Sequence, residues 1–372
     1  MKVLYIGHYR ESSGWATATQ NLIKALHSVD VDVVCRNIRL TNNTNIDPLF
    51  DQLENKDTNN VDYCIQHVLP HHITGTSKFK KNVSCSLLDS CNVQDNQWLP
   101  YLRNVNEVWV PCRDNYTELC RCGIPTKVVP YACDIKKYER DSNTDLGFDK
   151  QNVHSAYKFY TIADMGYRKN IQSIVKSYYS TFRPDDNVLL ILKINQTAIN
   201  RDMIFSHIHH MCSEIRKEMN IYKDENDYNN IMVIPDYFSE EEIHALHKEC
   251  DCYVNMSHGE SWCIPSFDAM CYGNHPISVG WGGPRDYIDA SNKNTGTLVD
   301  YSLVTCVNTG AAFKHLYTGR EFWATGNEMQ ASIAMRYYYE NRKDQKTQDG
   351  LNCGKNFTFE KVGSIMKDYL LS

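Results

Sequence analysis

Short apolar runs alternate with amphipathic stretches along the first part of the chain. Runs of this length, bounded by polar residues, are typical of buried strands, and they read VLYIG, VDVVCRNI, DYCIQHVL, NVSCSLL and EVWVPC. After the first run, Ala18, Leu22, Ala25 and Leu26 recur on one face of a helix that Ser13 can cap. Strands and helices therefore alternate, which is the pattern of a doubly wound parallel sheet.

A second alternating set follows a polar segment. Residues 141–155 show no apolar periodicity and are typical of a linker. The apolar runs KFYTIADM, NVLLILKI, NIMVIPDY and CYVNM follow, separated by stretches of helical periodicity. We therefore predict an α/β protein of two Rossmann-like doubly wound domains that face a central cleft. The predicted domains are residues 1–150 and 151–354, and a helix at about 355–372 is expected to pack back on the first domain.

The composition disfavours several classes of protein. Of the 372 residues, 42% are hydrophobic and 23% are charged, which suffices for an ordinary globular core. The net charge is −6 and there is no long basic run, so we expect no stable nucleic-acid complex. No apolar run reaches the roughly 18 residues of a membrane span, so we expect no transmembrane segment.

The fifteen cysteines do not follow a metal-binding pattern. The pairs Cys120/Cys122 and Cys250/Cys252 lack the C-x2-C spacing of zinc sites. The chain is also large and shows no export signal, whereas disulfide frameworks belong to small secreted domains. We therefore expect reduced thiols in a cytoplasmic protein, and no metal site.

Two acids lie close together in the stretch SHGESWCIPSFDAMCYGNHPISVGWGG. Glu260 falls in a loop at the carboxyl end of the strand CYVNM, and Asp268 falls about one turn into a helix that begins near Pro265. The carboxylates then flank a helix amino terminus, whose free N–H groups favour an anion. A nucleotide sugar fits this arrangement, because it has hydroxyls at both ends and phosphates in the middle. The alternative is that Glu260 is a helix N-terminal charge and Asp268 a solvated helix position.

This stretch resembles the E-x7-E segment of retaining GT-B glycosyltransferases, in particular glycosyltransferase family 4. Members typically read G-E-G-[FW]-G-[IL]-P, followed by E-A-M-x-x-G-x-P-V-I. Further segments resemble the family in the same order along nearly the full chain: SSGWATATQNLIKAL, EVWVPC, YRKNIQSIVKSYYSTF and VIPDYFSEEEIHALHKECDC. The resemblance implies a GT-B fold and retaining, metal-independent transfer of a sugar from a UDP- or GDP-linked donor, with no other cofactor.

The resemblance also implies roles for residues of the second domain. Glu260 would meet the donor sugar hydroxyls, and the backbone N–H groups of Ser261, Trp262 and Cys263 would hold the sugar and the distal phosphate. Asp268 would bind the ribose hydroxyls. Two departures stand here: Asp268 is Asp where Glu is usual, and Cys263 replaces a common glycine.

Cations and first-domain residues complete the expected site. Lys169, with Arg168 beside it, would meet the diphosphate, and Gly14 would close over the phosphates from the first domain. Asp89 aligns with an acid on the acceptor side, or else it caps a helix. A second family cation has no counterpart in TIADMGYRKN, and Lys193, at the end of a strand, is our candidate substitute.

Two further residues are assigned from strand position alone. Tyr237 follows a strand of the second domain and is a candidate for lining the nucleotide-base pocket. His67, in CIQHVLP, is interpreted as a strand-end residue, with lining of the cleft as the alternative.

The expected function is therefore a hexosyltransferase-type glycosyltransferase that uses an NDP-sugar. Glu260 would orient the donor and need not be a covalent nucleophile, while fixed cations and helix dipoles would stabilise the leaving diphosphate. Two alternatives remain: other GT-B chemistry such as a nucleotide-sugar 2-epimerase, and a non-catalytic nucleotide-sugar-binding protein. The acceptor is left open among glycan, lipid, protein and modified nucleobase, because fold does not determine it.

Overall fold

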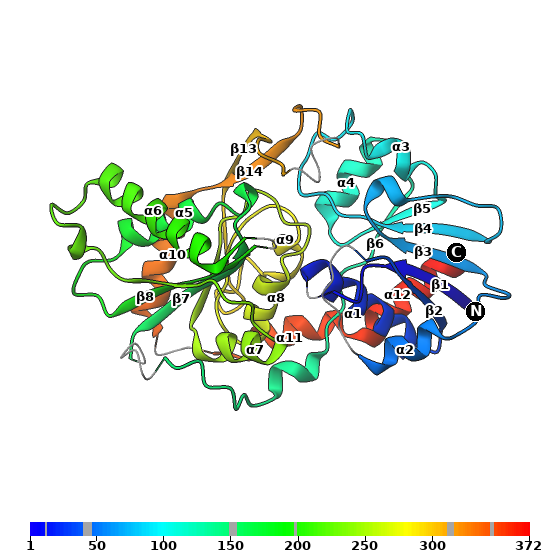
Figure 1. The fold of residues 1–372 in the computed structure, drawn as a ribbon, viewed down its shortest axis with the longest axis horizontal. Coiled ribbons are helices and arrows are strands. Elements are labelled where there is room, and N and C mark those ends of the chain that lie inside the picture. The colour runs from blue at the N-terminus through cyan, green and yellow to red at the C-terminus, as the bar shows by residue number, and fades with distance from the viewer. Residues whose placement is uncertain (12, 40–46, 149–154, 197–198, 311–315, 343–345) are drawn as a thin grey trace.

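Two parallel six-stranded sheets form the framework of the protein (Figure 1). The computed structural model describes residues 1–11, 13–39, 47–148, 155–196, 199–310, 316–342 and 346–372. The strand orders are β2-β1-β3-β4-β5-β6 and β12-β11-β10-β7-β8-β9. Each sheet reverses its winding direction, so the predicted α/β class with two doubly wound sheets is confirmed.

The first sheet and its helices occupy the amino-terminal part of the chain. Its strands are β1 (Lys2–Gly7), β2 (Asp32–Asn37), β3 (Tyr63–His67), β4 (Lys81–Cys85), β5 (Glu107–Val110) and β6 (Thr126–Val128). The helices are α1 (Gly14–Ser28), α2 (Pro48–Glu54), α3 (Leu99–Leu102) and α4 (Arg113–Arg121), with short 3-10 turns η1 (Pro70–His72) and η2 (Ile135–Glu139).

The second sheet follows the same plan. Its strands are β7 (Tyr157–Asp164), β8 (Val188–Asn195), β9 (Ile231–Ile234), β10 (Cys252–Asn255), β11 (Ile277–Val279) and β12 (Thr297–Val299). The helices are α5 (Ile171–Thr181), α6 (Arg201–Met219), α7 (Glu240–Glu249), α8 (Ile264–Cys271), α9 (Pro284–Tyr287) and α10 (Glu328–Glu340), with 3-10 turns η4 (Tyr167–Lys169) and η5 (Glu225–Asp227).

Side-chain caps begin several helices where polar residues follow a strand. The hydroxyl of Ser13 accepts a hydrogen bond from the backbone N–H of Ala16 at 3.1 Å, which starts α1. Ser239 and Glu242 form a reciprocal capping box at the start of α7. These caps place both helices directly after the carboxyl ends of their strands, where ligands of such sheets bind.

The carboxyl terminus returns to the first sheet. After α11 (Asp349–Gly354) and η8 (Lys355–Phe357), α12 (Phe359–Leu371) lies beside α1 (Figure 1). A side chain at Gly363 would meet the carbonyl oxygen of Ala25 at 2.0 Å, so the two helices pack too closely for anything but glycine there. The predicted domain boundary at residues 150/151 lies outside the described residues.

A hairpin absent from the predicted strand set links the two halves. Its strands β13 (Tyr301–Thr305) and β14 (Phe322–Gly326) are antiparallel, and they extend from the second sheet toward the region of α3 (Figure 1). Strand β14 also forms an antiparallel bridge with Cys91 of the first half.

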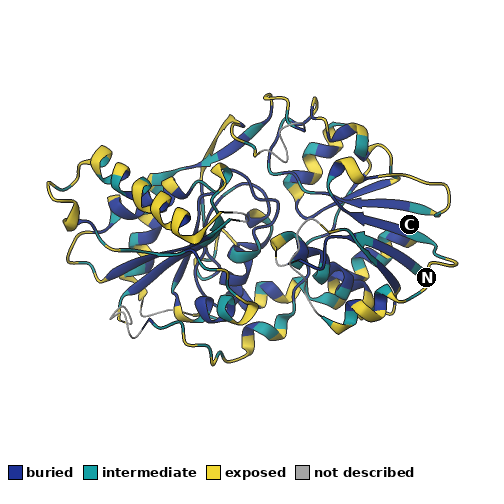
Figure 2. Cartoon of the chain, viewed as in Figure 1, coloured by how far each residue is buried: buried dark blue, intermediate teal, exposed yellow. Residues whose placement is uncertain are grey.

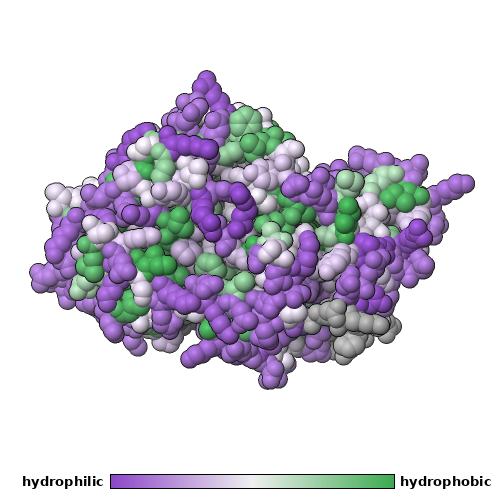
Figure 3. Space-filling model, turned by 180° about the vertical axis from the view of Figure 1, so that it is seen from behind, coloured by the Kyte–Doolittle hydropathy of each residue, from purple (hydrophilic) through white to green (hydrophobic). Residues whose placement is uncertain are grey.

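Burial follows the layers of the two sheets. The strands are mostly buried, and exposed residues lie on the outer faces of the helices (Figure 2). On the face seen in Figure 3, apolar side chains form separate patches among hydrophilic ones. Within the described ranges, no helix is long and apolar enough to span a membrane, and all fifteen cysteines are free thiols.

Candidate functional site

Glu260 pairs with two cations from a neighbouring strand. It lies in the loop after β10, and Lys169 and Arg168 lie in η4 after β7, the strand that pairs with β10. Its Oε1 lies 2.6 Å from Nζ of Lys169 and 3.5 Å from Nη1 of Arg168. Burial raises the pKa of the Glu260 carboxyl, but the charges of Lys169 and Arg168 outweigh it and hold this pKa below its usual value. The carboxylate is therefore ionised.

Arg168 lies between acids from the two halves of the molecule. Its Nε is 3.4 Å from Oδ2 of Asp89, which follows β4 of the first sheet. Its Nη1 donates a hydrogen bond to the carbonyl oxygen of Gly259, and its own carbonyl oxygen accepts one from His258 N–H at 2.7 Å. The turn that carries the cations and the loop that carries Glu260 are thus fastened to each other.

Asn170, the residue after Lys169, shapes the turn that carries the two cations. Asn170 has φ +48° and ends η4 in the left-handed region, which Gly and Asn adopt most readily. Its side chain donates to the carbonyl oxygen of Met256 at 3.1 Å. This backbone turn directs Lys169 toward Glu260.

The amino terminus of α8 lies next to Glu260. In the described part of the chain, no residue accepts a hydrogen bond from the backbone N–H of Ser261, Trp262 or Cys263. Free N–H groups at a helix amino terminus, beside two cations, are suited to bind a phosphate. The indole of Trp262 itself is buried against Tyr131 and other aromatic rings, so only its backbone is available.

Cys263, which replaces a common glycine of the resemblance, has a left-handed backbone conformation. It has φ +64° and ψ +74° as the residue that precedes α8. A non-glycine residue in this region carries strain of about 1–3 kcal/mol. Its thiol is buried in an apolar cluster that includes Tyr253, and burial raises the pKa of this thiol.

Asp268 is buried in α8 and both carboxylate oxygens have protein partners. Oδ1 accepts a hydrogen bond from the hydroxyl of Tyr138 at 2.6 Å, and Oδ2 lies 3.0 Å from Nζ of Lys137. Both partners belong to η2, in the segment between the two sheets. The alternative of a solvated helix position is therefore wrong, and a ribose would have to share Asp268 with these two side chains.

Asp89 meets the Glu260 loop directly, and it caps no described helix. Its Oδ1 lies 3.2 Å from the hydroxyl of Ser261, which also donates to the carbonyl oxygen of Leu88 at 2.9 Å. A side chain at Gly259 would come within 1.8 Å of the Asp89 carbonyl oxygen. The two halves are in contact at this point.

Three predicted residues have no described contact with the Glu260 cluster. Gly14 is exposed, and a Cβ at this position would have nothing within 4 Å. Tyr237 is 55% exposed in the loop after β9. Lys193 is buried at the end of β8 with Nζ 5.0 Å from the ring centre of Phe238, and burial lowers its pKa to about 8.

A pocket of about 490 Å³ opens beside β9. Phe238 and Asp236 line it at the carboxyl end of the strand, together with Phe205 and Arg201 of α6. Arg201 lies 2.8 Å from Asp236 in an ion pair. Tyr237 is not among the lining residues, whereas its neighbour Phe238 is.

His67 is a buried histidine at the end of β3. Its Nδ1 lies 3.1 Å from the hydroxyls of both Tyr5 and Thr19. Burial, and then the neighbouring His8, lower its pKa to about 3, so the imidazole is neutral. The only signal in the sequence was its position after an apolar run.

Several polar atoms near His67 are buried without a hydrogen-bond partner in the described part of the molecule. They are Nε2 of His67, Nε2 of His8, Nε1 of Trp15 and the hydroxyl of Tyr131. The His67 ring centre lies 5.8 Å from that of Trp15 and 6.5 Å from that of Tyr131. Buried polar groups are normally paired, so this cluster is a candidate site for ligand hydroxyls.

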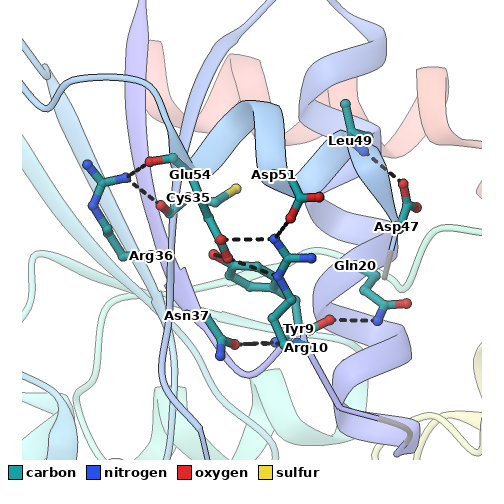
Figure 4. Close-up of polar contacts among 10 residues, drawn as sticks. All are labelled: Tyr9, Arg10, Gln20, Cys35, Arg36, Asn37, Asp47, Leu49, Asp51 and Glu54. Carbon is teal, nitrogen blue, oxygen red and sulfur yellow. Dashed lines mark hydrogen bonds and ion pairs between the residues drawn. The ribbon is translucent and has the colours of Figure 1, made fainter. Parts of the chain in front are cut away.

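Arg10 anchors the loop between β1 and α1 (Figure 4). Its guanidinium donates to Oε1 of Glu54 at 3.0 Å and to Oε2 at 2.9 Å, and it also pairs with Asp51 of α2. The hydroxyl of Tyr9 donates to the same Glu54 at 2.7 Å, and Gln20 of α1 holds the Tyr9 carbonyl at 2.7 Å. These contacts fix Tyr9 and Arg10 against α1 and α2.

Among the described residues, no group of three or more His, Cys, Asp or Glu side chains is arranged to hold a metal ion.

The fold that places these residues is the GT-B fold of glycosyltransferases, and full-length similarity to solved structures shows it. HepE from Anabaena, in complex with UDP, is similar with a TM-score of 0.68 and 12% identity over 100% of both chains. Sucrose-phosphate synthase from Thermosynechococcus elongatus has a TM-score of 0.65 and 13% identity, over 99% of this chain and 98% of that one.

A third similar structure is the catalytic domain of starch synthase IV from Arabidopsis thaliana, bound to ADP and acarbose. Its TM-score is 0.62 at 10% identity, over 100% of this chain and 99% of that one. The sequence matches no protein-family model and no curated protein. At these identities the similarity shows the fold alone.

Proposed function

We propose that this protein transfers a sugar from a nucleoside-diphosphate sugar to an acceptor, at the junction of the two sheets. The second half of the chain binds the donor and the first half binds the acceptor, with the division near residues 150/151. The GT-B fold and the UDP-glucose complex of HepE support a UDP-linked donor as the first to test.

One observation carries this proposal. Glu260, Arg168, Lys169 and the unpaired N–H groups of residues 261–263 meet at the carboxyl edge of β10 and β7. This arrangement matches a sugar joined to a diphosphate. The carboxylate can accept hydrogen bonds from sugar hydroxyls, and the two cations and the helix amino terminus can bind the phosphates. Asp268 lies further along α8, where it contributes to the ribose site together with Lys137 and Tyr138.

The chemistry follows from where charge develops. Breaking the bond between the anomeric carbon and the diphosphate leaves negative charge on the phosphate oxygens. Lys169, Arg168 and the α8 amides stabilise that charge without a metal ion. Glu260 then orients the sugar hydroxyls, and the acceptor attacks from the face of the leaving group, which retains the anomeric configuration. We propose that this takes place in the cytoplasm, where free thiols persist.

The proposal is tested by binding first and chemistry second. A thermal-shift panel of UDP, GDP, ADP and their glucose conjugates should identify a stabilising ligand, because a ligand at a hundredfold over its dissociation constant adds about 2.7 kcal/mol. NMR of the product then reports the anomeric configuration after transfer to an acceptor.

Product analysis with the stabilising nucleotide sugar separates the alternatives. An epimerase releases free nucleotide and an altered sugar without any acceptor, and a binding protein shows a shift without turnover. If no nucleotide or nucleotide sugar stabilises the protein at millimolar concentration, the proposal is wrong.

A further inference from the structure

Strand β14 joins the two halves through one of its edges. Its other edge pairs with β13. On the edge that faces away from β13, Phe322 exchanges two backbone hydrogen bonds with Cys91, at 3.0 and 3.1 Å. Two residues further, the N–H of Ala324 donates to the carbonyl oxygen of His258 at 2.8 Å. The segment just after Asp89 and the segment just before Glu260 thus lie next to each other along a single strand.

The hairpin is firmly fixed to the first half. The carbonyl oxygen of Leu316 accepts a hydrogen bond from Gln97 N–H at 3.0 Å, and Leu316 packs in the core cluster of Trp98. Buried Glu321 accepts a hydrogen bond from the Asn96 side chain at 3.0 Å. These contacts fix Leu316 and Glu321 to the first half, while Ala324 of β14 packs in the core of the second half.

Trp323 connects the hairpin to the Glu260 loop. Its indole is 2% exposed and stacks on the ring of His258, with ring centres 5.7 Å apart and an interplanar angle of 2°. Tyr167, the residue before Arg168, stacks on both rings, with centres 5.5 Å from His258 and 6.3 Å from Trp323. The stack therefore joins the hairpin to the loop of Glu260 and to the turn of the cations.

The backbone of His258 completes this connection. Its N–H donates to the carbonyl oxygen of Arg168 at 2.7 Å, and its carbonyl oxygen accepts from Ala324. Its Nδ1 lies 3.1 Å from the hydroxyl of Thr325. Three consecutive residues of β14 thus contact His258, which lies two positions before Glu260. Trp323 stacks on its ring, Ala324 donates to its carbonyl oxygen, and Thr325 contacts its Nδ1.

We propose that Trp323 is a positioning residue, which acts through the ring of His258 to hold Glu260 and Arg168 in register with Asp89 across the junction. The proposal rests on the sugar transfer proposed above. Trp323 is buried against His258 and Tyr167, so it acts through these rings. Its indole sets the distance between the two halves at the point where Arg168 contacts both acids.

The test compares Trp323→Leu, which removes the ring, with Trp323→Phe, which keeps a stacking face. UDP-glucose turnover is measured as release of UDP. We expect kcat of Trp323→Leu to fall about tenfold to a hundredfold, because a displacement of about 1 Å at a reacting centre can cost about 10²-fold. The affinity for UDP should fall less than kcat, since UDP keeps the diphosphate contacts of Lys169 and the α8 amides but lacks the sugar that Glu260 orients. Trp323→Phe should restore most of kcat.

Controls separate positioning from loss of stability. Trp109→Leu removes a buried indole from the first sheet, away from His258, and should lower the melting temperature while kcat at a temperature well below melting is kept. Trp323→Met keeps much of the bulk without a ring and replaces the Leu variant if that variant does not fold.

A second readout does not depend on turnover. Hydrogen exchange of the backbone amides at Ser257–Glu260 should be faster in Trp323→Leu than in wild type, with α12 unchanged. Equal kcat in all Trp323 variants, or unchanged exchange in this loop, would overturn the proposal. Failure of wild type to bind any nucleotide sugar would instead contradict the proposed function, while the exchange result would still stand.

Discussion

Nζ of Lys169 lies 2.6 Å from Oε1 of Glu260, although the two residues are far apart in the sequence. Each follows one of two paired parallel strands, so both side chains emerge at the same sheet edge. The cation and the acid neutralise each other. A sugar diphosphate would take the cation with its phosphate and the acid with its hydroxyls.

The first prediction follows from this pair. Glu260→Gln should lower UDP-glucose turnover by about 10²-fold, comparable to the loss of one transition-state hydrogen-bond partner. UDP binding should be retained, because Lys169 and Arg168 remain and lose their internal counter-charge. Turnover kinetics and calorimetric titration with UDP measure the two effects. A variant that loses UDP affinity but keeps turnover would place the diphosphate elsewhere.

The second prediction concerns Asp268. Asp268→Asn should destabilise the protein by about 1–3 kcal/mol, because the partly buried ammonium of Lys137 loses its counter-charge. It should also weaken UDP binding if the ribose shares this carboxylate. Urea denaturation and UDP titration are the measurements.

A double-variant cycle provides the control for Asp268. Lys137→Met removes the cation, so the combined Asp268→Asn/Lys137→Met variant should recover part of the lost stability. Strict additivity of the two changes would show that the pair contributes nothing as a pair.

The sequence was sufficient to predict the two doubly wound sheets, because apolar runs of strand length alternate with amphipathic helices. The family resemblance assigned Glu260 and Lys169 to one donor site, but not to each other. Their ion pair is a finding of the structure, where the loops after two paired parallel strands meet at one sheet edge.

Other contacts had no signal in the sequence. Lys137 and Tyr138 lie just before the polar linker, and only the path of the chain between the sheets brings them to Asp268. Strand β13 is exposed at all five residues, so it lacks the alternation of buried and exposed positions that identifies a strand.

The third prediction tests the strained backbone at Cys263. Cys263→Gly should stay within about 1 kcal/mol of wild type, because relief of the left-handed strain offsets the lost burial of the thiol and the gain in unfolded-state entropy. Cys263→Val should lose about 2 kcal/mol or more, since a β-branched residue is a genuine outlier at positive φ. Chemical denaturation of both variants gives the comparison, and equal stability of the two would refute a strain at this position.

The fourth prediction uses the contact between the two halves at Gly259. In Gly259→Ala the new methyl group would lie 1.8 Å from the Asp89 carbonyl oxygen, so one loop must move. We expect a loss of about 1–3 kcal/mol, as for other overpacked sites, and a lower kcat with UDP affinity kept. Gly14→Ala is the stability control, because a Cβ there meets nothing within 4 Å. Wild-type kcat in Gly259→Ala would mean that Asp89 is not needed close to Glu260.

The fifth prediction concerns stability in acid. Burial lowers the pKa of His67 and of His247 to about 3, whereas an unfolded histidine has a pKa of about 6.5. Between these pH values the unfolded chain binds a proton at each residue and the folded chain does not. Stability is therefore complete above pH of about 6.5 and falls below it, by about 1.4 kcal/mol per pH unit for each histidine.

Urea denaturation between about pH 4.5 and pH 6.5 should consequently show a steep loss of the free energy of unfolding as the pH falls, on top of the contribution of the carboxylates. His247 is the residue to replace, because its Nδ1 contacts Tyr160 away from Glu260. In His247→Gln one of the two neutral imidazoles is gone, so the slope should decrease by about 1.4 kcal/mol per pH unit. Glu260 does not contribute to the slope between about pH 4.5 and pH 6.5. Because its pKa is lowered, the stability from its ion pairs is lost only as the pH falls below the usual carboxyl pKa. An unchanged slope in His247→Gln would show that the pKa of His247 is not lowered in the folded protein, so that the imidazole takes up its proton there as it does in the unfolded chain.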